Sequence, residues 1–469
     1  MRSLTWEGYL GDFGGYGEES RFFVFDSLPH NRQNKILNLL TNKLSDQVVT
    51  KKLFELNKNK NWGVANEMMF FDKKKWWLCK DITEALQLLI DKNKKRDRYL
   101  VIHAPAWQRA NDNDVHLFTT HKSLNFSYQL FFGRTTFESK DIPEKFIHEL
   151  NQMDHVHCQS SFNLINFKRC GMKTPGFVLP NGISWDAFSK ADLTRNTYLK
   201  VQVSNKYTLF DVSEVYIYDA LARYDYKFLV VFNSYAEMWK RKNIHILLQE
   251  FQKFNDSVDR RACLTIKSNL EREYIKKNIH SNLDDVITLD TSLSMGAMRA
   301  LYHPFDVFIN LSSGEALGIP YLEAAACNNR IMALNYGGHL DFLNSKNSYL
   351  VKTKGFAPWV SEDEDVKSFA YDGCEFPTVD TDHLQKTFIE ITEDISKGDT
   401  KDLKSIEMFN EACLIKWHVF ISFLASKTTH QLKHKNIEKD FEIFAEKERY
   451  NFKGGDEINQ EVYQNYYVK

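Results

Sequence analysis

The chain has 469 residues, more than a single hydrophobic core usually organises, so two domains with additions are expected. Its 61 basic and 62 acidic residues nearly cancel, which argues against a large polyanion-binding face. Seven scattered cysteines without a CxxC pair predict reduced thiols, a cytoplasmic location and no structural zinc. The first residues lack an apolar targeting segment and no apolar run reaches the length of a membrane span, so at most peripheral membrane contact is expected.

The first hundred residues contain a glycine loop and a buried strand. Residues 1–10 are expected to form the first strand, and the loop GDFGGYG follows at 11–17. Such a loop lets backbone amides approach a phosphate or an acceptor, although glycine loops are also common as plain turns. Residues 99–102 read as a buried strand, with His103 at its carboxyl end, where parallel sheets place ligands. A single histidine at that position is more often structural than catalytic.

Residues 133–188 are expected to alternate helices and strands. Phe146, Ile147 and Leu150 recur at helical spacing, and residues 156–158 are strand-like. The sequence VLPNG at 178–182 ends a further strand in a turn. Most of this stretch is therefore interpreted as scaffold.

A strand, a basic cluster and a helix are predicted in succession from residue 226. Residues 189–226 lack clean periodicity and are expected to contain the connection between domains, and the apolar run 226–232 restarts the strand pattern. Residues 240–243 (KRKN) precede an amphipathic helix at 244–254. A basic cluster between strand and helix can neutralise a leaving diphosphate, although many such clusters are exposed helix starts. Lys267, at the end of the next strand, is a second candidate for the nucleotide side.

The central unit is a strand–helix–strand repeat at residues 306–341. A short apolar run enters it, Pro320 suits the first turn of a helix, and residues 331–334 form a second apolar run before a glycine loop. Glu315 lies before the helix and Glu323 is expected in its first turn, with seven residues between them. The free amides at a helix start attract an anion such as a diphosphate, and the two carboxylates suit neutral sugar hydroxyls. The alternative is a surface glutamate and a helix-start glutamate that only complements the helix dipole.

The sequence EALGIPYLEAAA at 315–326 resembles the E-x7-E signature of retaining glycosyltransferases of family 4, the glycosyl transferases group 1. Residues 133–188 resemble another recurring run of that family, with an acidic residue before Ile-Pro and a later P-N-G-I. Members have the α/β GT-B fold, two Rossmann-like domains whose parallel sheets face an interdomain cleft. Ala316 and Leu317 stand where glycine and phenylalanine are commoner, which leaves the identity of the sugar open.

The resemblance implies roles by position. Glu315 matches the glutamate that binds donor-sugar hydroxyls, and Glu323 the one that binds the nucleotide ribose. Lys242 takes the lysine position of the family's phosphate clamp, and Arg241 is expected to replace a clamp arginine that is absent from its usual place. The expected catalytic set is Glu315, Lys242 and His103; the expected donor-binding set is Glu323, Arg241, Lys267, Gly14, Gly15, Ala316, Leu317, Gly318 and Ile319. Arg134 and Glu138 are expected in a cleft-facing loop within reach of the acceptor.

The predicted organisation is an acceptor-side domain at 1–200, a nucleotide-sugar-binding domain at 201–425 and a tail at 426–469 that packs back on the first domain. The predicted function is retaining transfer of a sugar from a UDP- or GDP-sugar to a hydroxyl of a glycan, a lipid-linked glycan, a protein or a modified nucleic acid. Neither a permanent cofactor nor a metal is expected, and the D-x-D spacing at Asp380 and Asp382 is interpreted as a solvated loop. The alternatives are a nucleotide-sugar epimerase, a non-catalytic nucleotide-sugar sensor and a transferase acting on modified DNA bases.

Overall fold

The computed structural model describes two compact units. Unit 1 comprises Met1–Phe137, Ile142–Gly182 and Glu411–Lys469, and unit 2 comprises Glu138–Asp141 and Ile183–Asn410. Within them the described residues are 3–7, 98–103, 105–110, 113–124, 129–191, 193, 199–204, 212–232, 238–268, 285–289, 293, 295–359, 371, 373–434 and 436–451. The predicted glycines Gly14 and Gly15 lie outside these residues.

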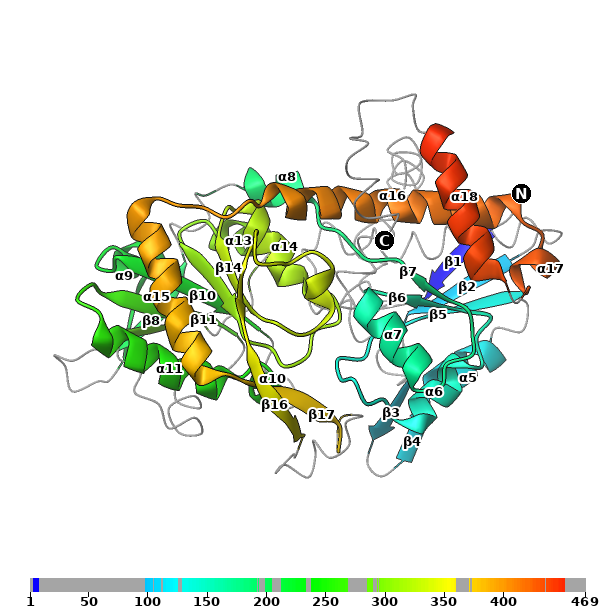
Figure 1. Ribbon diagram of the computed structural model, residues 1–469, viewed down its shortest axis with the longest axis horizontal. Coiled ribbons are helices and arrows are strands. Elements are labelled where there is room, and N and C mark those ends of the chain that lie inside the picture. The colour runs from blue at the N-terminus through cyan, green and yellow to red at the C-terminus, as the bar shows by residue number, and fades with distance from the viewer. Residues whose placement is uncertain are drawn as a thin grey trace, which may run out of the picture. The chain divides into compact units, whose positions relative to one another are not determined.

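Unit 1 is built on a five-stranded sheet in the order β1-β2-β5-β6-β7, in which every strand pair is parallel (Figure 1). Its strands are β1 Ser3–Glu7, β2 Arg98–His103, β5 Leu130–Arg134, β6 His155–Cys158 and β7 Gly176–Val178. The hairpin of β3 Trp107–Ala110 and β4 Asn113–His116 stands apart from this sheet. The helices are α5 Leu117–Leu124, α6 Glu144–Leu150, α7 Ser161–Arg169, α17 Thr429–Leu432 and α18 Ile437–Asn451.

The core of unit 1 contains polar side chains held among aromatic rings. Arg134 is fully buried; it donates to Leu179 O at 2.9 Å and to Asn181 Oδ1 at 2.7 Å, and its guanidinium lies 5.0 Å from the Trp417 ring. The expectation that Arg134 lies in a ligand-facing loop is therefore wrong. It is the last residue of β5, and its charge is used to fix the turn at Asn181.

Unit 2 is built on an eight-stranded sheet in the order β15-β14-β13-β10-β11-β12-β8-β9. The six strands from β15 to β12 are parallel, and β8 and β9 add an antiparallel edge. The strands are β8 Lys200–Ser204, β9 Val212–Tyr216, β10 Tyr226–Val231, β11 Ala262–Lys267, β12 Val286–Leu289, β13 Val307–Asn310, β14 Arg330–Leu334 and β15 Tyr349–Val351. The antiparallel ribbon of β16 Thr353–Pro358 and β17 Glu375–Val379 follows. The α/β fold class, with parallel sheets in both units, is confirmed.

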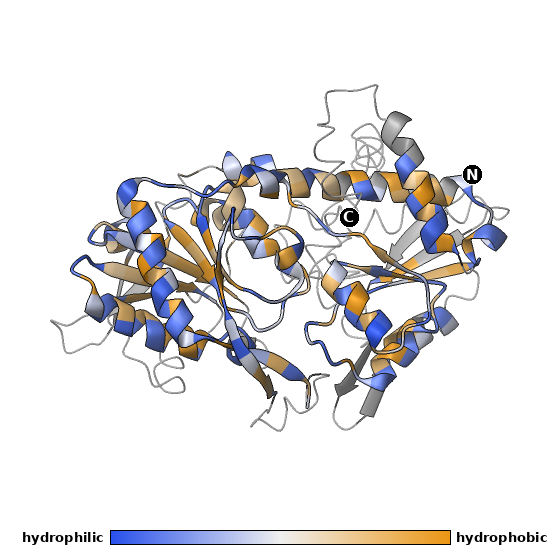
Figure 2. Ribbon diagram, viewed as in Figure 1, coloured by the Kyte–Doolittle hydropathy of each residue, from blue (hydrophilic) through white to orange (hydrophobic). Residues whose placement is uncertain are grey.

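Helices cover both faces of the unit 2 sheet. On one face α11 Ile244–Ser257 packs beside α15 Thr381–Lys397, and on the other face α14 Ile319–Ala326 packs near α13 Met295–Leu301 and α8 Trp185–Ser189 (Figure 1). The shorter helices of this unit are α9 Ile217–Leu221, α10 Met238–Arg241 and the 3-10 helix η5 Gly338–Asp341. The central strands of the sheet are mostly apolar in Figure 2, whereas α11 and α15 alternate in hydropathy because each has a solvent face.

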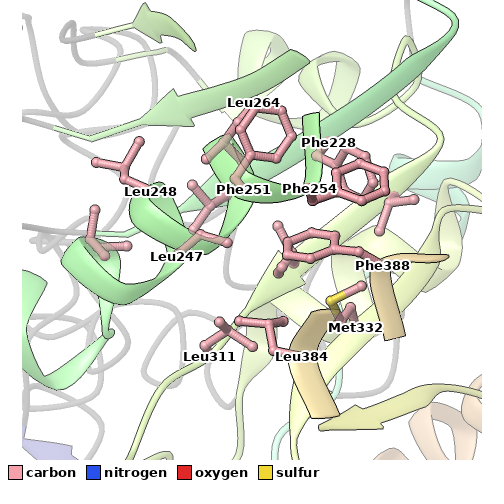
Figure 3. Packing of buried hydrophobic residues seen from close by; sticks show 14 of the residues in the cluster. Phe228, Leu247, Leu248, Phe251, Phe254, Leu264, Leu311, Met332, Leu384 and Phe388 are labelled. Atoms are coloured by element: carbon pink, nitrogen blue, oxygen red, sulfur yellow. The ribbon is translucent and has the colours of Figure 1, made fainter. Parts of the chain in front are cut away.

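The core under α11 and α15 is rich in phenylalanine. Phe254 and Phe388 stack with ring centroids 4.9 Å apart, and Phe228 meets Phe388 edge-on at 5.6 Å (Figure 3). Leu311 and Met332, which lie close to the loop that carries Glu315, belong to the same cluster. The position of that loop is therefore set by a fully packed sheet.

The carboxyl-terminal segment groups with unit 1. The sequence placed the boundary after residue 200 and counted residues up to 425 with the second domain, whereas contacts place the division after Gly182 and again after Asn410. Within unit 1, Trp417 Nε1 donates to Pro180 O at 3.2 Å and His155 Nε2 to Leu432 O at 2.6 Å. The long helix α16 Lys404–Ser426 therefore contributes residues to both units. Among the described helices, none combines the length and apolarity needed to cross a bilayer.

The buried His155 predicts an acid-sensitive unit 1. Burial lowers the pKa of His155 to about 4 from 6.5, although the bond to Leu432 and the charges of Asp154 and Glu438 oppose this. The unfolded chain therefore binds an additional proton between these pH values. The free energy of unfolding should consequently fall by about 3 kcal/mol as the pH drops from 6.5 to 4.

Urea unfolding of wild type and His155→Phe at several pH values measures this effect. The free energy of unfolding of the variant should lack the pH dependence that one proton contributes, about 1.4 kcal/mol per pH unit in that window. His430→Phe, at an exposed position, serves as the control and should keep the wild-type slope. Equal slopes for wild type and His155→Phe would contradict the assignment.

Candidate functional site

The sheet order of unit 2 creates a topological switch point between β10 and β13. The chain leaves β10 toward β11 on one side and later returns through β13 on the other, and β10 pairs in parallel with both. In open parallel sheets, ligands bind at the carboxyl ends of the strands where the order reverses. The basic cluster follows β10 and Glu315 follows β13, so both predicted groups lie at this edge.

Asn243 fastens the loop after β13 to the start of α11. Its backbone is left-handed at φ 53°, a conformation that asparagine tolerates better than most residues. Its side-chain amide donates to Leu311 O and to Ser313 Oγ, both at 2.7 Å. The loop leading to Glu315 is thus held by the segment that follows Lys242.

Arg241 also holds this loop in place through hydrogen bonds. Its guanidinium donates to the carbonyl oxygen of Gly314 and lies 3.5 Å from Ser312 Oγ. Ser313 N in turn donates to Arg241 O at 2.8 Å. The residue is 7 % exposed, so the arginine expected at the phosphate clamp braces the loop of Glu315 from within.

Lys242 and Glu315 form a buried ion pair. Lys242 Nζ donates to Glu315 Oε1, and the two side chains are 12 % and 11 % exposed. Asn310 Nδ2 donates to the same carboxylate oxygen at 3.1 Å. The structure therefore brings together the first glutamate of the signature and the lysine of the basic cluster, both of which are predicted site residues.

The electrostatics of this pair keep the carboxylate ionised. Burial alone would raise the pKa of Glu315, but the charges of Lys242 and Arg241 and the bond from Lys242 outweigh it and lower the pKa to about 2. Burial lowers the pKa of Lys242, against the attraction of Glu315. A buried, permanently ionised carboxylate can accept hydrogen bonds from neutral hydroxyl groups without changing its charge state.

The helix α14 begins earlier than the sequence indicated. It spans Ile319–Ala326, so the first turn contains no acidic residue and Glu323 lies in the second turn. The expected first-turn position of Glu323 is therefore wrong. Its Oε2 accepts a hydrogen bond from the Tyr302 hydroxyl, and the side chain is half-buried.

The loop between the two glutamates offers unpaired backbone donors. Within the described part of the chain, the amides of Ala316, Leu317, Gly318 and Ile319 donate to no protein acceptor. Gly318 has φ +86°, a left-handed conformation that a residue with a Cβ rarely adopts. Successive free amides before a helix are an arrangement that can bind an anion.

A second glycine loop supports Glu315 from the side of β14. Gly338 N donates to Glu315 O at 2.8 Å, and a Cβ on Gly337, which has φ +124°, would lie 3.2 Å from the same oxygen. His339 is fully buried, donates through Nε2 to Leu334 O at 2.7 Å and lies 4.8 Å from the Tyr321 ring. Burial lowers the pKa of His339, although Glu315 opposes this.

The remaining predicted residues belong to other elements. Lys267 ends β11, which is separated from β13 by β10. His103 ends β2 in unit 1, is 1 % exposed and lies opposite Arg134 in the strand register. The roles proposed for both stay predictions. Asp380 caps α15 by accepting from His383 N at 2.9 Å, so the D-x-D segment starts a helix and is not the plain loop that was expected.

The sequence did not predict that Asn310 and Glu138 belong to this site. Asn310, which is 1 % exposed, also accepts from Ser312 N at 3.1 Å; a polar amide at the end of an apolar strand was the available signal. Glu138 lies 4.0 Å from Arg241 Nη2 and accepts from the Tyr371 hydroxyl. Glu138 was predicted to lie within reach of the acceptor. No residue close to it in the sequence indicated a contact with Arg241.

Comparison with known proteins identifies the class. A family model described as "Glycosyl transferases group 1" matches residues 227–370, which contain the basic cluster and both glutamates. The family resemblance is confirmed for this region, which is a group 1 glycosyltransferase domain. Among curated proteins, none matches the chain.

Solved structures resemble the chain at low identity. The Anabaena protein HepE in complex with UDP and glucose is 12 % identical, with 73 % of this chain and 81 % of that one covered at a TM-score of 0.47. A sucrose-phosphate synthase from Thermosynechococcus elongatus is 12 % identical, with 76 % and 80 % covered at 0.45. An alpha,alpha-trehalose-phosphate synthase (UDP-forming) from Burkholderia vietnamiensis is 12 % identical, with 76 % and 78 % covered at 0.47.

Gly314 predicts a steric constraint on this site. A Cβ at this position would lie 2.5 Å from Glu138 O and 2.9 Å from Glu138 Cβ, and backbone atoms cannot yield cheaply. Gly314→Ala should therefore lower the free energy of unfolding by about 1–3 kcal/mol, measured by urea unfolding. Gly355→Ala, whose nearest neighbour would be Thr378 Oγ1 at 4.0 Å, is the control. Equal stability of the two variants would refute the constraint.

Proposed function

We propose that the protein is a retaining glycosyltransferase that moves a sugar from a UDP- or GDP-sugar to a hydroxyl acceptor. The observation that carries the proposal is the ionised Glu315, paired with Lys242 beside four unpaired amides at the switch point of unit 2. Phosphate oxygens need donors and cations, whereas sugar hydroxyls need an acceptor. This edge of the sheet offers all of these groups side by side.

The roles follow from the chemistry of each group. Glu315 accepts hydrogen bonds from donor-sugar hydroxyls, and Lys242 exchanges part of its contact with Glu315 for a phosphate oxygen. The amides of residues 316–319 bind the diphosphate, and Glu323 accepts from the ribose. Arg241 contributes positive charge from behind the loop, and Lys267 serves the nucleotide side.

Front-face transfer accounts for the reaction without a protein nucleophile. The bond between the anomeric carbon and the diphosphate oxygen breaks, while the acceptor oxygen bonds to that carbon on the same face. The acceptor proton passes to the leaving phosphate oxygen. The protein then supplies positioning and stabilises the charge that grows on the diphosphate, and no metal ion is required.

The proposal extends to residues of unit 1. His103, which ends β2, contacts the donor sugar, and Gly14 and Gly15 contact the donor through their backbone. The acceptor is a hydroxyl of a glycan, a lipid-linked glycan, a protein or a modified nucleic acid. A cytoplasmic location, with at most peripheral membrane contact, belongs to the same proposal.

Removing the charge of Glu315 tests the catalytic assignment. Glu315→Gln keeps the size of the side chain but loses the anionic acceptor, so transfer should fall at least a hundredfold, by analogy with loss of a single charge-stabilising group. The assay first screens UDP- and GDP-sugars by thermal shift and then follows hydrolysis and transfer. Glu393→Gln, 60 % exposed on α15, is the matched control and should retain activity.

The same assays separate the alternatives. Turnover of a folded Glu315→Gln variant at the wild-type rate would remove the assignment. Donor isomerised without an acceptor, seen by NMR, would indicate an epimerase, and binding without hydrolysis or transfer would indicate a sensor. Inversion at the anomeric carbon of the product would refute retention.

Glu323 should act on nucleotide binding more than on chemistry. Glu323→Gln keeps an acceptor for the ribose but loses its charge, so the Kd for the nucleoside diphosphate should rise about three- to tenfold, since a charged hydrogen bond is replaced by a neutral one that is weaker by about 1 kcal/mol. Isothermal titration measures this directly. Tyr302→Phe, which removes the hydroxyl that donates to Glu323, should show a smaller rise. An unchanged Kd in Glu323→Gln would place the ribose elsewhere.

A further inference from the structure

A short segment that follows β5 in sequence belongs by its contacts to unit 2. Residues Glu138–Asp141 lie against the β16–β17 ribbon, where Lys140 Nζ is 2.7 Å from Glu375 Oε2 and Ser139 Oγ donates to Glu375 O at 3.0 Å. Cys374 Sγ lies 3.1 Å from Asp141 O. Three consecutive attachments fix the segment and therefore fix where Glu138 sits.

Glu138 reaches the centre of the site from this segment. Its carboxylate accepts from the Tyr371 hydroxyl and lies 4.0 Å from Arg241 Nη2. Only 20 % of the side chain is exposed. Its backbone passes so close to Gly314 that no Cβ fits between them. Glu138 thus touches both the arginine that braces the loop and the glycine that precedes Glu315.

Arg241 consequently lies between two anchors of different kinds. One anchor is the backbone carbonyl of Gly314, whose strength does not vary, and the other is the carboxyl group of Glu138, whose charge can. Lys242 and Glu315 complete the group of charges that faces Glu138. The charges of this group balance when Glu138 is ionised, and one positive charge remains when it is protonated.

We propose that Glu138 is a positioning residue of the donor site, which orients Arg241 and whose charge sets how tightly the site retains the nucleoside diphosphate. The inference rests on the proposed function, because it assigns to that site a group outside the matched family region. An ionised Glu138 competes with the diphosphate for the positive charge of Arg241 and Lys242. It therefore weakens binding and assists release of the product.

The environment of Glu138 gives this competition a pH dependence. Burial raises the pKa of Glu138, and the Glu315 carboxylate adds to the rise, whereas Arg241 and Lys242 oppose it. As the pH rises through this elevated pKa the carboxyl group ionises, and affinity for the diphosphate should fall. Tyr371, whose hydroxyl bonds to the carboxylate, is a further titratable group that contacts it.

Glu138→Gln in the full chain tests the inference. The Kd values of UDP and GDP are measured by isothermal titration between pH 5.5 and 8.5, and the Ki of the same product is measured during transfer. Wild type should bind more weakly as the pH rises. Glu138→Gln should bind on the order of tenfold more tightly at the upper end of the range, with a flatter profile, since one opposing charge is removed.

Two further variants separate charge from structure. Tyr371→Phe removes a hydrogen bond to the ionised form, so its pH profile should shift to higher pH while Glu138 stays in place. Glu393→Gln changes a carboxylate on α15 that is 60 % exposed and makes no contact with this segment among the described interactions, and it should leave Kd and profile unchanged. A merely structural role of Glu138 would lower thermal stability without altering the pH profile.

The possible results lead to distinct conclusions. A folded Glu138→Gln variant with the Kd and pH profile of wild type would overturn the role of Glu138 while donor transfer stood. Absence of UDP and GDP binding by wild type itself would overturn the proposed function and this inference with it. The inference is supported only if Glu138→Gln binds UDP or GDP more tightly than wild type and with a flatter pH profile.

Discussion

The ion pair between Lys242 and Glu315 is the interaction on which the described site depends. Each partner is nearly buried, so either charge alone would be costly in this environment. The pair joins two segments that leave neighbouring parallel strands, and the packed phenylalanine cluster beneath the sheet determines where those strands end. Sheet topology thereby fixes a charge distribution and, through it, the chemistry available at the edge.

The surrounding residues form layers of support around this pair. Asn243 and Arg241 bind the loop from the side of β10, and Gly338 binds Glu315 from the side of β14. Most of these contacts are to backbone atoms. The loop is therefore held in place by bonds that a bound ligand need not break, whereas the Lys242 side chain remains the group best suited to exchange partners. A rigid frame with one adaptable cation suits a site that must stabilise charge formed during a reaction.

Periodicity and motif spacing predicted the unit 2 framework well because its strands are buried on both faces and read as apolar runs. The strand predicted from residue 226 and the strand–helix–strand unit predicted at 306–341 follow from such local signals. Three features did not. Pro320 marked the helix start closely, yet α14 begins one residue before it, which moves Glu323 out of the first turn. Arg134 was predicted in a loop because a charged residue rarely ends a buried strand. Glu138 contacts Arg241, which is far away in the sequence, so motif spacing could not predict the contact.

The membership of residues 138–141 in unit 2 affects how this enzyme can be recombined with others. A chimaera joined only after residue 182 would present a foreign side chain to Arg241 and a foreign backbone to Gly314. A unit 2 exchanged between related chains should therefore include residues 138–141. The same consideration applies to Glu411–Lys469, which should travel with the amino-terminal partner. Modular exchange here follows the contacts of the folded chain and not its linear order.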